Sequence, residues 1–177
     1  MSTSPASSAA ARPAPTEYAP YYERYVSLVA GDVVETLERQ AAETAAILGG
    51  LGEERGDSRY EPGKWSVKEL ISHVVDTERI FAYRLLRIAR GDRTPMEGFD
   101  QDPYVANSNA GARTLRSLAE EFAHVRAATL ALVRSLDDAA WSRTGVANEN
   151  EVTVRALAHI IAGHEAHHMG VLRERYL

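Results

Sequence analysis

Apolar residues recur every three or four positions in four separate segments of this 177-residue chain. Such spacing lines up one face of a helix and therefore predicts amphipathic α-helices. The predicted helices run from about 32 to 48, 66 to 91, 111 to 136 and 153 to nearly the C-terminus. Almost no segment alternates apolar and polar residues as a strand does. Four amphipathic helices bury their apolar faces most simply against one another, so we expect an all-α four-helix bundle.

The second predicted helix has a clear start and is followed by a long connection. Ser66 and Glu69 have the spacing of a capping box at its N-terminus. The connection to the third helix, residues 92–110, contains Pro95 and Pro103 and is longer than a usual bundle loop. Loops of this length often act as lids over a functional site. Its length would also permit a crossover, so the direction of the third helix stays open.

The first residues, 1–17, are rich in Ala, Ser and Pro and lack the basic start and apolar run of a secretory signal. We expect a disordered lead-in at 1–17, one domain over 18–177, and a cytoplasmic protein. No stretch approaches the roughly 18 consecutive apolar residues of a membrane-spanning helix, so we expect no membrane partner.

Charge and composition argue against several functions. The chain has 20 Lys and Arg residues spread among 25 Asp and Glu residues, and its formal net charge is -5. A nucleic-acid binder usually presents a basic face, so we expect no nucleic-acid partner. The chain contains no cysteine, which excludes disulfides, thiolate metal ligands and a cysteine nucleophile.

Three of the six histidines, His164, His167 and His168, lie together in the fourth predicted helix. Steps of 4, 3, 4 and 3 residues connect Leu157, Ile161, His164, His168 and Val171. Such steps mark the seam of a bundle helix that faces the core. His167 lies on the flank of this seam, where a polar side chain reaches water. Two imidazoles buried side by side are costly unless their nitrogens have partners, and one metal ion would satisfy both. The seam therefore favours His164 and His168 over the pair of His164 and His167.

A site with two protein ligands is weak, so we expect a third ligand from another helix. His73, at the edge of the apolar arc of the second helix, is the best candidate, although a lone histidine is more often a hydrogen-bonded or exposed residue. His159 points roughly 140° away from His164 around the fourth helix. His124 lies among charged residues and is expected at the surface. We therefore predict one divalent metal ion held by His73, His164 and His168.

Residues 164–168, His-Glu-Ala-His-His, match the zincin signature H-E-x-x-H. The context differs, because the metzincin continuation needs Gly and His where this chain has Val171 and Glu174. No strand-rich substrate-binding half precedes the helix, so we do not expect a metalloprotease. Glu165 remains the candidate catalytic base, and the alternative for it is a solvated helix position.

The chain also carries a distinctive set of motifs. They are Tyr-Glu-Pro-Gly-Lys-Trp-Ser-Val-Lys-Glu at 60–69, Ser72-His73 followed by Asp-Thr-Glu-Arg-Ile-Phe-Ala-Tyr-Arg at 76–84, Gly-Phe-Asp-Gln-Asp at 98–102, Ala-Gly-His-Glu-Ala-His-His at 162–168 and Leu-Arg-Glu-Arg-Tyr-Leu at 172–177. In this combination the sequence resembles the DinB-like family of bacterial proteins, including its YfiT branch, from about Tyr18 to the end of the chain.

The resemblance implies a four-helix bundle with a three-histidine metal site, made of one histidine of the second helix and a His-x3-His pair of the fourth. His73, His164 and His168 stand at those positions. The resemblance leaves the ion open among zinc, nickel, iron and manganese, and it implies a homodimer. Relatives include S-transferases that use low-molecular-weight thiols such as bacillithiol, mycothiol-dependent isomerases, and proteins described as metal-dependent hydrolases.

We expect a metal-dependent enzyme that acts on a small-molecule substrate. The favoured hypothesis is transfer of a bacillithiol-type thiol, bound to the metal as thiolate, to an electrophile held under the 92–110 loop. The lack of cysteine fits a thiol that arrives on a cosubstrate. Arg84 would suit an acidic thiol, and its alternative role is a surface salt bridge.

Two alternatives to thiol transfer stay open. The first is hydrolysis by metal-bound hydroxide, with Glu165 or Asp100 assisting proton transfer. For Asp100 the sequence favours a turn-forming role over catalysis. The second is a non-catalytic metal-binding stress protein, whose ion would have every coordination position filled by protein.

Overall fold

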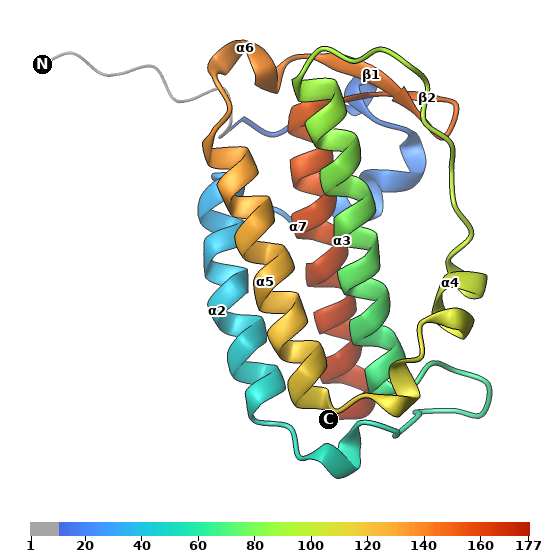
Figure 1. Cartoon of the computed structure of the whole chain (residues 1–177). Coiled ribbons are helices and arrows are strands. Elements are labelled where there is room, and N and C mark those ends of the chain that lie inside the picture. Colours follow the sequence, from blue (N-terminus) through green and yellow to red (C-terminus); the bar gives the residue numbers. More distant parts are fainter. Residues whose placement is uncertain (1–10) are drawn as a thin grey trace, which may run out of the picture.

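The computed structural model describes residues 11–177, which form a four-helix bundle (Figure 1). Its long helices are α2 (Val33–Gly49), α3 (Val67–Ala89), α5 (Leu115–Arg134) and α7 (Val154–Val171). The predicted all-α four-helix bundle is therefore confirmed. Within the described residues, no helix has the length and apolar character needed to cross a membrane.

Two successive long helices, α3 and α5, run in the same direction. The chain ascends in α3, returns along the outside of the bundle through residues 92–110, and ascends again in α5 (Figure 1). Helices α2 and α7 run the opposite way. Helix α5 packs against α2 and α3, and α7 packs against the same two helices. The long connection is thus a crossover, one of the arrangements that the sequence left open.

Each long helix begins at a side chain that accepts a hydrogen bond from a free backbone amide. The four capping residues are Asp32, Ser66, Thr114 and Thr153. Ser66 and Glu69 form the predicted capping box, because each side chain accepts from the backbone amide of the other residue. This cap fixes the start of α3 about two turns before His73.

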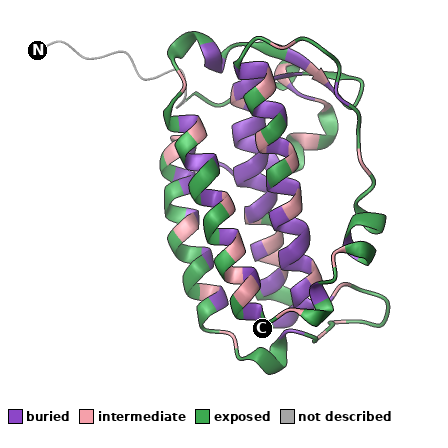
Figure 2. Cartoon of the chain, in the orientation of Figure 1, coloured by how far each residue is buried: buried purple, intermediate pink, exposed green. Residues whose placement is uncertain are grey.

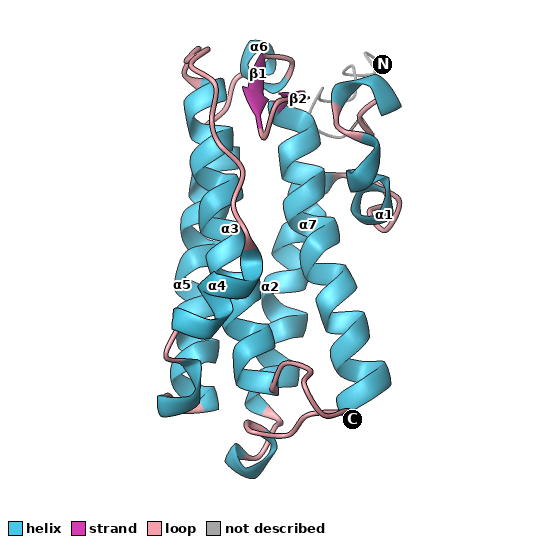
Figure 3. Cartoon of the chain, turned by 90° about the vertical axis from the view of Figure 1, so that its right-hand side faces the viewer, coloured by secondary structure: helices cyan, strands magenta, loops and turns pink. Residues whose placement is uncertain are grey.

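The crossover at residues 92–110 is anchored at several points and runs beside α3 (Figure 3). Asp100 accepts from the backbone amide of Asp102 and caps the short helix α4 (Gln101–Asn107), as its predicted turn-forming role requires. The backbone of Met96 makes two hydrogen bonds, of 2.9 and 2.8 Å, to a β-hairpin. The segment is therefore a fixed wall along α3.

A β-hairpin that was not predicted from the sequence lies between α5 and α7 in the chain. Its antiparallel strands are β1 (Thr144–Ala147) and β2 (Asn150–Thr153). Asn148 and Glu149 at its tip have φ values of 51° and 63°, and the type I′ turn requires positive φ at both positions. An Asn-Glu pair lacks the glycine that usually signals this turn. A short helix, α6 (Asp138–Trp141), precedes the hairpin, and Trp141 is buried there.

The first described residues pack along α7. They form two 3-10 turns, Pro15–Glu17 and Pro20–Tyr22, followed by the short helix α1 (Glu23–Val26). The Glu17 carboxylate pairs with the guanidinium of Arg155 in α7 at 2.7 Å. Of the predicted lead-in, residues 15–17 thus form an ordered turn, and residues 1–10 lie outside the described residues.

The apolar core consists of two clusters, separated by a layer of buried polar side chains. Figure 2 shows that α7 is buried along most of its length, whereas α2 and α5 expose their outer faces. Every long helix contributes to the polar layer between the clusters. This central polar layer consists of Gln40 and Thr44 of α2, Glu78 of α3, Arg126 of α5 and Glu165 of α7.

Arg126 holds the central polar layer together. Its guanidinium is 1 % exposed and donates to the two oxygens of Glu78 at 2.9 and 2.8 Å. It also donates to Glu165 at 3.1 Å and to the backbone carbonyl of Leu37 at 3.2 Å. Glu165 accepts a further hydrogen bond from the hydroxyl of Thr44. All four long helices are therefore joined by hydrogen bonds at one level of the bundle.

Replacing Arg126 by methionine should lower the free energy of unfolding by about 3–5 kcal/mol, because two carboxylates would stay buried without their counter-charge. Urea unfolding followed by circular dichroism measures this change. The control is Arg134→Met, which removes an ion pair with Glu38 whose side chains are both exposed. That variant should lose less than about 1 kcal/mol. Equal stability of the two variants would contradict the role given to Arg126.

Gly163 lies where α1 contacts α7, and an added Cβ would lie 2.0 Å from the carbonyl oxygen of Tyr25. Gly163→Ala should displace α1 and lower the free energy of unfolding by about 1–3 kcal/mol. Gly170, in the same helix, has only open space around an added Cβ. Gly170→Ala should therefore stabilise the protein by up to about 1 kcal/mol. The same urea titration tests both variants, and a stabilising Gly163→Ala would show that α1 does not depend on this contact.

Candidate metal centre

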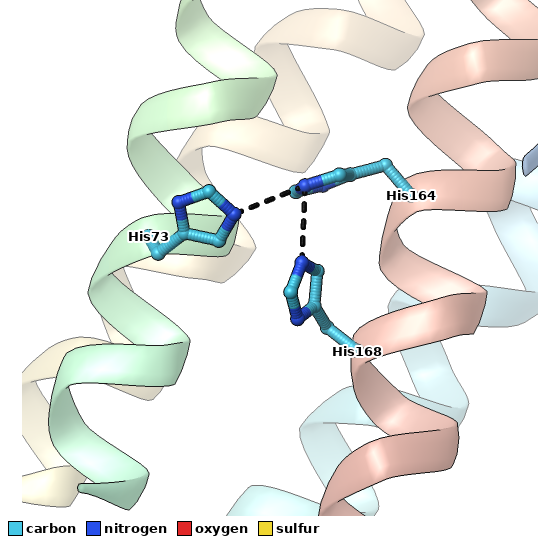
Figure 4. A group of neighbouring side chains, drawn as sticks. All are labelled: His73, His164 and His168. Carbon is cyan, nitrogen blue, oxygen red and sulfur yellow. Dashed lines mark hydrogen bonds between the residues drawn. The ribbon is translucent and has the colours of Figure 1, made fainter. Parts of the chain in front are cut away.

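Three histidines meet between α3 and α7 (Figure 4). His73 projects from α3, and His164 and His168 project one turn apart from α7. The Nε2 atom of His164 lies 3.1 Å from Nε2 of His73 and 3.2 Å from Nε2 of His168. One ring nitrogen from each of the three residues lies within 4.8 Å of the other two. The structure thus brings together the three predicted metal ligands, and the ion itself stays a prediction.

Neighbouring side chains hold these rings in place. The hydroxyl of Thr77, one turn after His73, lies 3.4 Å from the Nδ1 atom of that histidine. The Trp65 ring packs on the same imidazole, with centroids 4.7 Å apart. The ring of Tyr25 in α1 meets the His164 ring edge-on at 5.3 Å. These contacts orient the His73 ring so that its Nε2 atom faces His164 of α7.

Burial keeps the three imidazoles uncharged at neutral pH. It lowers the pKa of His73 to about 4 and that of His168 to about 3, and it holds the pKa of His164 well below its usual range. Neutral imidazole carries the lone pair that binds a metal ion. The Nε2 atom of His164 faces two other ring nitrogens but can share a proton with only one of them. A single cation would satisfy all three nitrogens, so this donor set fits a divalent metal ion.

The other three histidines do not join this group. His167 is exposed, as its place on the flank predicts, and its ring packs against that of Tyr25 with centroids 5.6 Å apart. His124 is exposed on α5, also as predicted. His159 is buried away from the site, with its Nδ1 atom 2.9 Å from the carbonyl oxygen of Arg155.

Glu165 follows His164 in the sequence but faces a different side of α7. It is 1 % exposed, so the alternative of a solvated helix position is wrong. Its carboxylate accepts from Thr44 and Arg126 within the central polar layer. Burial raises the pKa of Glu165, and Arg126 and Thr44 act against this rise. These contacts describe a residue that positions α7, and its predicted role as a catalytic base stays a prediction.

Two cavities reach the candidate metal centre, one at His164 and the other at His168. We call the first the aromatic cavity; it has a volume of about 310 Å³ and is lined by Tyr21, Tyr22, Tyr25, Thr77, Phe81, Phe99, Asn148, Asn150 and His164 together with Ala19. We call the second the lysine cavity; it has a volume of about 240 Å³ and is lined by Tyr60, Gly63, Lys64, Trp65, Leu70, His167, His168, Val171 and Tyr176. Within the described part of the chain, neither lining includes a carboxylate. A larger cavity of about 720 Å³ at the hairpin end contains none of the three histidines.

Most residues of the aromatic cavity are not among the predicted site residues. Tyr21, Tyr22 and Tyr25 come from the segment before α2, to which no function was assigned. Their spacing, three tyrosines within five residues, was the available signal. Phe99 belongs to the crossover and lines the same cavity. Of the predicted lid, residues 92–110, Phe99 therefore forms part of the cavity wall.

Arg84 is buried within α3, at 4 % exposure, and donates to the backbone carbonyl of Glu97 at 2.6 Å. The alternative of a surface salt bridge is therefore wrong for this residue. Asp100, considered as an assistant in hydrolysis, caps α4 and does not line either cavity.

Solved structures share this fold at low sequence identity. YfiT from Bacillus subtilis, described as "a probable metal-dependent hydrolase with an unusual four-helix bundle topology", aligns with a TM-score of 0.72 and 17 % identity over 80 % of this chain and 82 % of its own. A mycothiol-dependent maleylpyruvate isomerase aligns with a TM-score of 0.64 and 15 % identity over 77 % of this chain. The aligned part covers 58 % of that isomerase. At these identities the likeness shows the fold alone.

Sequence comparisons supply the family. A protein of Oceanobacillus iheyensis, provisionally named a metal-dependent hydrolase, is 22 % identical over 142 residues, which cover 79 % of each protein. The family model of the DinB superfamily matches residues 36–172. Because this match covers most of the sequence and includes all three site histidines, the chain belongs to the DinB superfamily.

Proposed function

We propose that His73, His164 and His168 bind one divalent metal ion, and that the protein is an enzyme that transfers a bacillithiol-type thiol to an electrophilic substrate. The observation that carries the metal site is the meeting of three imidazole nitrogens, from His73, His164 and His168, within 4.8 Å of one another. When bound, the ion supplies a positive charge that stabilises a thiolate at neutral pH. The mycothiol dependence of the isomerase that shares the fold supports a thiol cosubstrate.

The surroundings of the histidines favour a thiol over water as the nucleophile. Water activation benefits from a base that accepts the proton, and no carboxylate of the described residues lines either cavity. Glu165, the candidate base, is engaged by Arg126 and Thr44. A thiol has a pKa near 8.5 and loses its proton much more easily than water does. Thiol transfer therefore needs no protein base at the site, whereas hydrolysis benefits from one.

The two cavities suit the two reactants. The lysine cavity carries the exposed Lys64 and reaches His168, so it suits an acidic thiol. The aromatic cavity reaches His164 and suits an apolar electrophile. In the reaction, sulfur bonds to the electrophilic carbon, the bond from that carbon to its leaving group breaks, and the thiol proton passes to solvent. Thr77 keeps the His73 ring in its orientation through this step.

Hydrolysis is the second candidate, because two relatives carry names that describe metal-dependent hydrolases. It differs from thiol transfer in needing no thiol. The choice among zinc, nickel, iron and manganese and the expected homodimer stay predictions; metal analysis and light scattering measure them directly.

His164→Ala should abolish stoichiometric metal binding, because the Nε2 atom of His164 is the one that faces both other ring nitrogens. We expect the affinity for zinc to fall more than about 100-fold, since loss of even an outer-shell partner often costs 10–100-fold. Competition with a chromophoric chelator measures the affinity. His124→Ala, at an exposed position on α5, is the control and should bind one ion per chain. Retention of one ion per chain by His164→Ala would refute the site.

Metal-loaded protein should accelerate the reaction of bacillithiol with monochlorobimane, which releases chloride and forms a fluorescent thioether. Chelated protein and His164→Ala should show only the uncatalysed rate. Aryl esters, offered with and without thiol, test the second candidate. No acceleration of the thiol reaction over the chelated control would count against thiol transfer, and ester hydrolysis without thiol would favour a hydrolase.

A further inference from the structure

The last helix changes from an α-helix to a π-helix beside the lysine cavity. The π-helical turn covers Leu172–Tyr176 and follows α7 without a break. Hydrogen bonds in a π-helix span five residues instead of four, so the side chains of this turn are displaced from their α-helical positions. Such turns are rare and occur frequently at functional sites. A specific contact made by this turn would explain its presence.

Tyr176 makes such a contact. It is 8 % exposed, and its hydroxyl donates to the backbone carbonyl of Trp65 at 2.5 Å. The backbone carbonyl of Tyr176 accepts from the guanidinium of Arg55 at 2.6 Å. The Tyr176 ring meets the ring of Tyr60 edge-on, with centroids 5.1 Å apart. The π-helical turn is thus fastened at three points to the connection between α2 and α3.

Three side chains hold the backbone around Trp65. Arg59 donates to the carbonyl oxygen of the preceding residue, and Glu69 accepts from the amide of the following residue. Both of these side chains belong to the same short stretch of chain as Trp65. Tyr176 lies 111 residues further along the chain and is the one of the three that ties this stretch to the end of α7.

Trp65 connects this contact to the candidate metal centre. Its indole packs on the imidazole of His73, with centroids 4.7 Å apart and an angle of 46° between the ring planes. The indole is half-buried and also lines the lysine cavity, together with His168 and Tyr176. A movement of the indole would therefore change both the support of the His73 ring and the space beside His168.

We propose that Tyr176 is a positioning residue of the metal centre. By holding the Trp65 carbonyl, it keeps the indole against His73 and sets the shape of the lysine cavity. Its effect on the indole needs no bound ion, whereas its effects on metal affinity and on thiol binding rest on the proposed function. The alternative is that Tyr176 stabilises the fold without any specific effect on the site.

Tryptophan fluorescence of the chelated protein tests the contact itself. Tyr176→Phe removes the hydroxyl and keeps the ring, so acrylamide should quench Trp65 more strongly in this variant than in the unmodified protein. The other tryptophan, Trp141, is 3 % exposed, and a Trp65→Phe variant gives its signal alone. The control is Tyr104→Phe, at a 48 % exposed position on α4, which should be quenched like the unmodified protein. Equal quenching of Tyr176→Phe and Tyr104→Phe would overturn the proposal.

Metal affinity tests whether Tyr176 acts through Trp65. Tyr176→Phe should weaken zinc binding about 2–10-fold, the usual contribution of one hydrogen bond. In a Trp65→Ala background the same substitution should have no further effect, because no indole is left to hold. An equal loss of affinity in both backgrounds would assign Tyr176 to general stability and overturn the proposal.

Thiol kinetics separate this proposal from the proposed function. At saturating zinc, Tyr176→Phe should raise KM for bacillithiol and leave kcat nearly unchanged; an unchanged KM would overturn the assignment to the lysine cavity. If the unmodified protein binds zinc but transfers no thiol, the proposed reaction fails, and the quenching and affinity measurements still decide the role of Tyr176. If it binds no metal, the proposed site fails, and quenching alone decides whether Tyr176 positions Trp65.

Discussion

The ion pairs of Arg126 are the interaction on which the rest of the bundle depends. A guanidinium that is 1 % exposed is tolerable only if its donors and charge are satisfied. Its partners Glu78, Glu165 and the carbonyl of Leu37 come from three different helices. A shift of any helix by one turn would leave a buried charge without its partner. Apolar side chains tolerate such shifts more easily, so the polar layer selects the register of the bundle.

The same layer sets the orientation of the metal centre. Glu165 and His164 are consecutive in α7, so their side chains point about 100° apart around the helix. Thr44 and Arg126 hold Glu165 towards α2 and α5. His164 is thereby turned towards His73 on α3. The crossover has a part in this arrangement, because it makes α3 and α5 parallel and brings Glu78 and Arg126 to the same level.

Local and periodic signals explain what could be predicted from the sequence. The capping box at Ser66 and the seam of His164 and His168 each lie within a few residues, so their geometry follows from the helix alone. The resemblance to a known family identifies His73 as the third ligand more firmly than helical periodicity does, because periodicity within one helix cannot connect positions 73 and 164. For the same reason the sequence cannot exclude a solvated position for Glu165, because its partners Thr44 and Arg126 lie on other helices.

The burial of Arg84 and Arg126 could not be predicted, because single arginines in helical segments look alike in sequence. Their difference lies in their partners. Arg126 is neutralised by carboxylates across the bundle, whereas Arg84 is surrounded by rings and a backbone carbonyl. Folding accounts for the first arrangement, since the ion pairs join helices. It accounts for the second only in part, because a neutral donor could hold the carbonyl of Glu97 at lower cost.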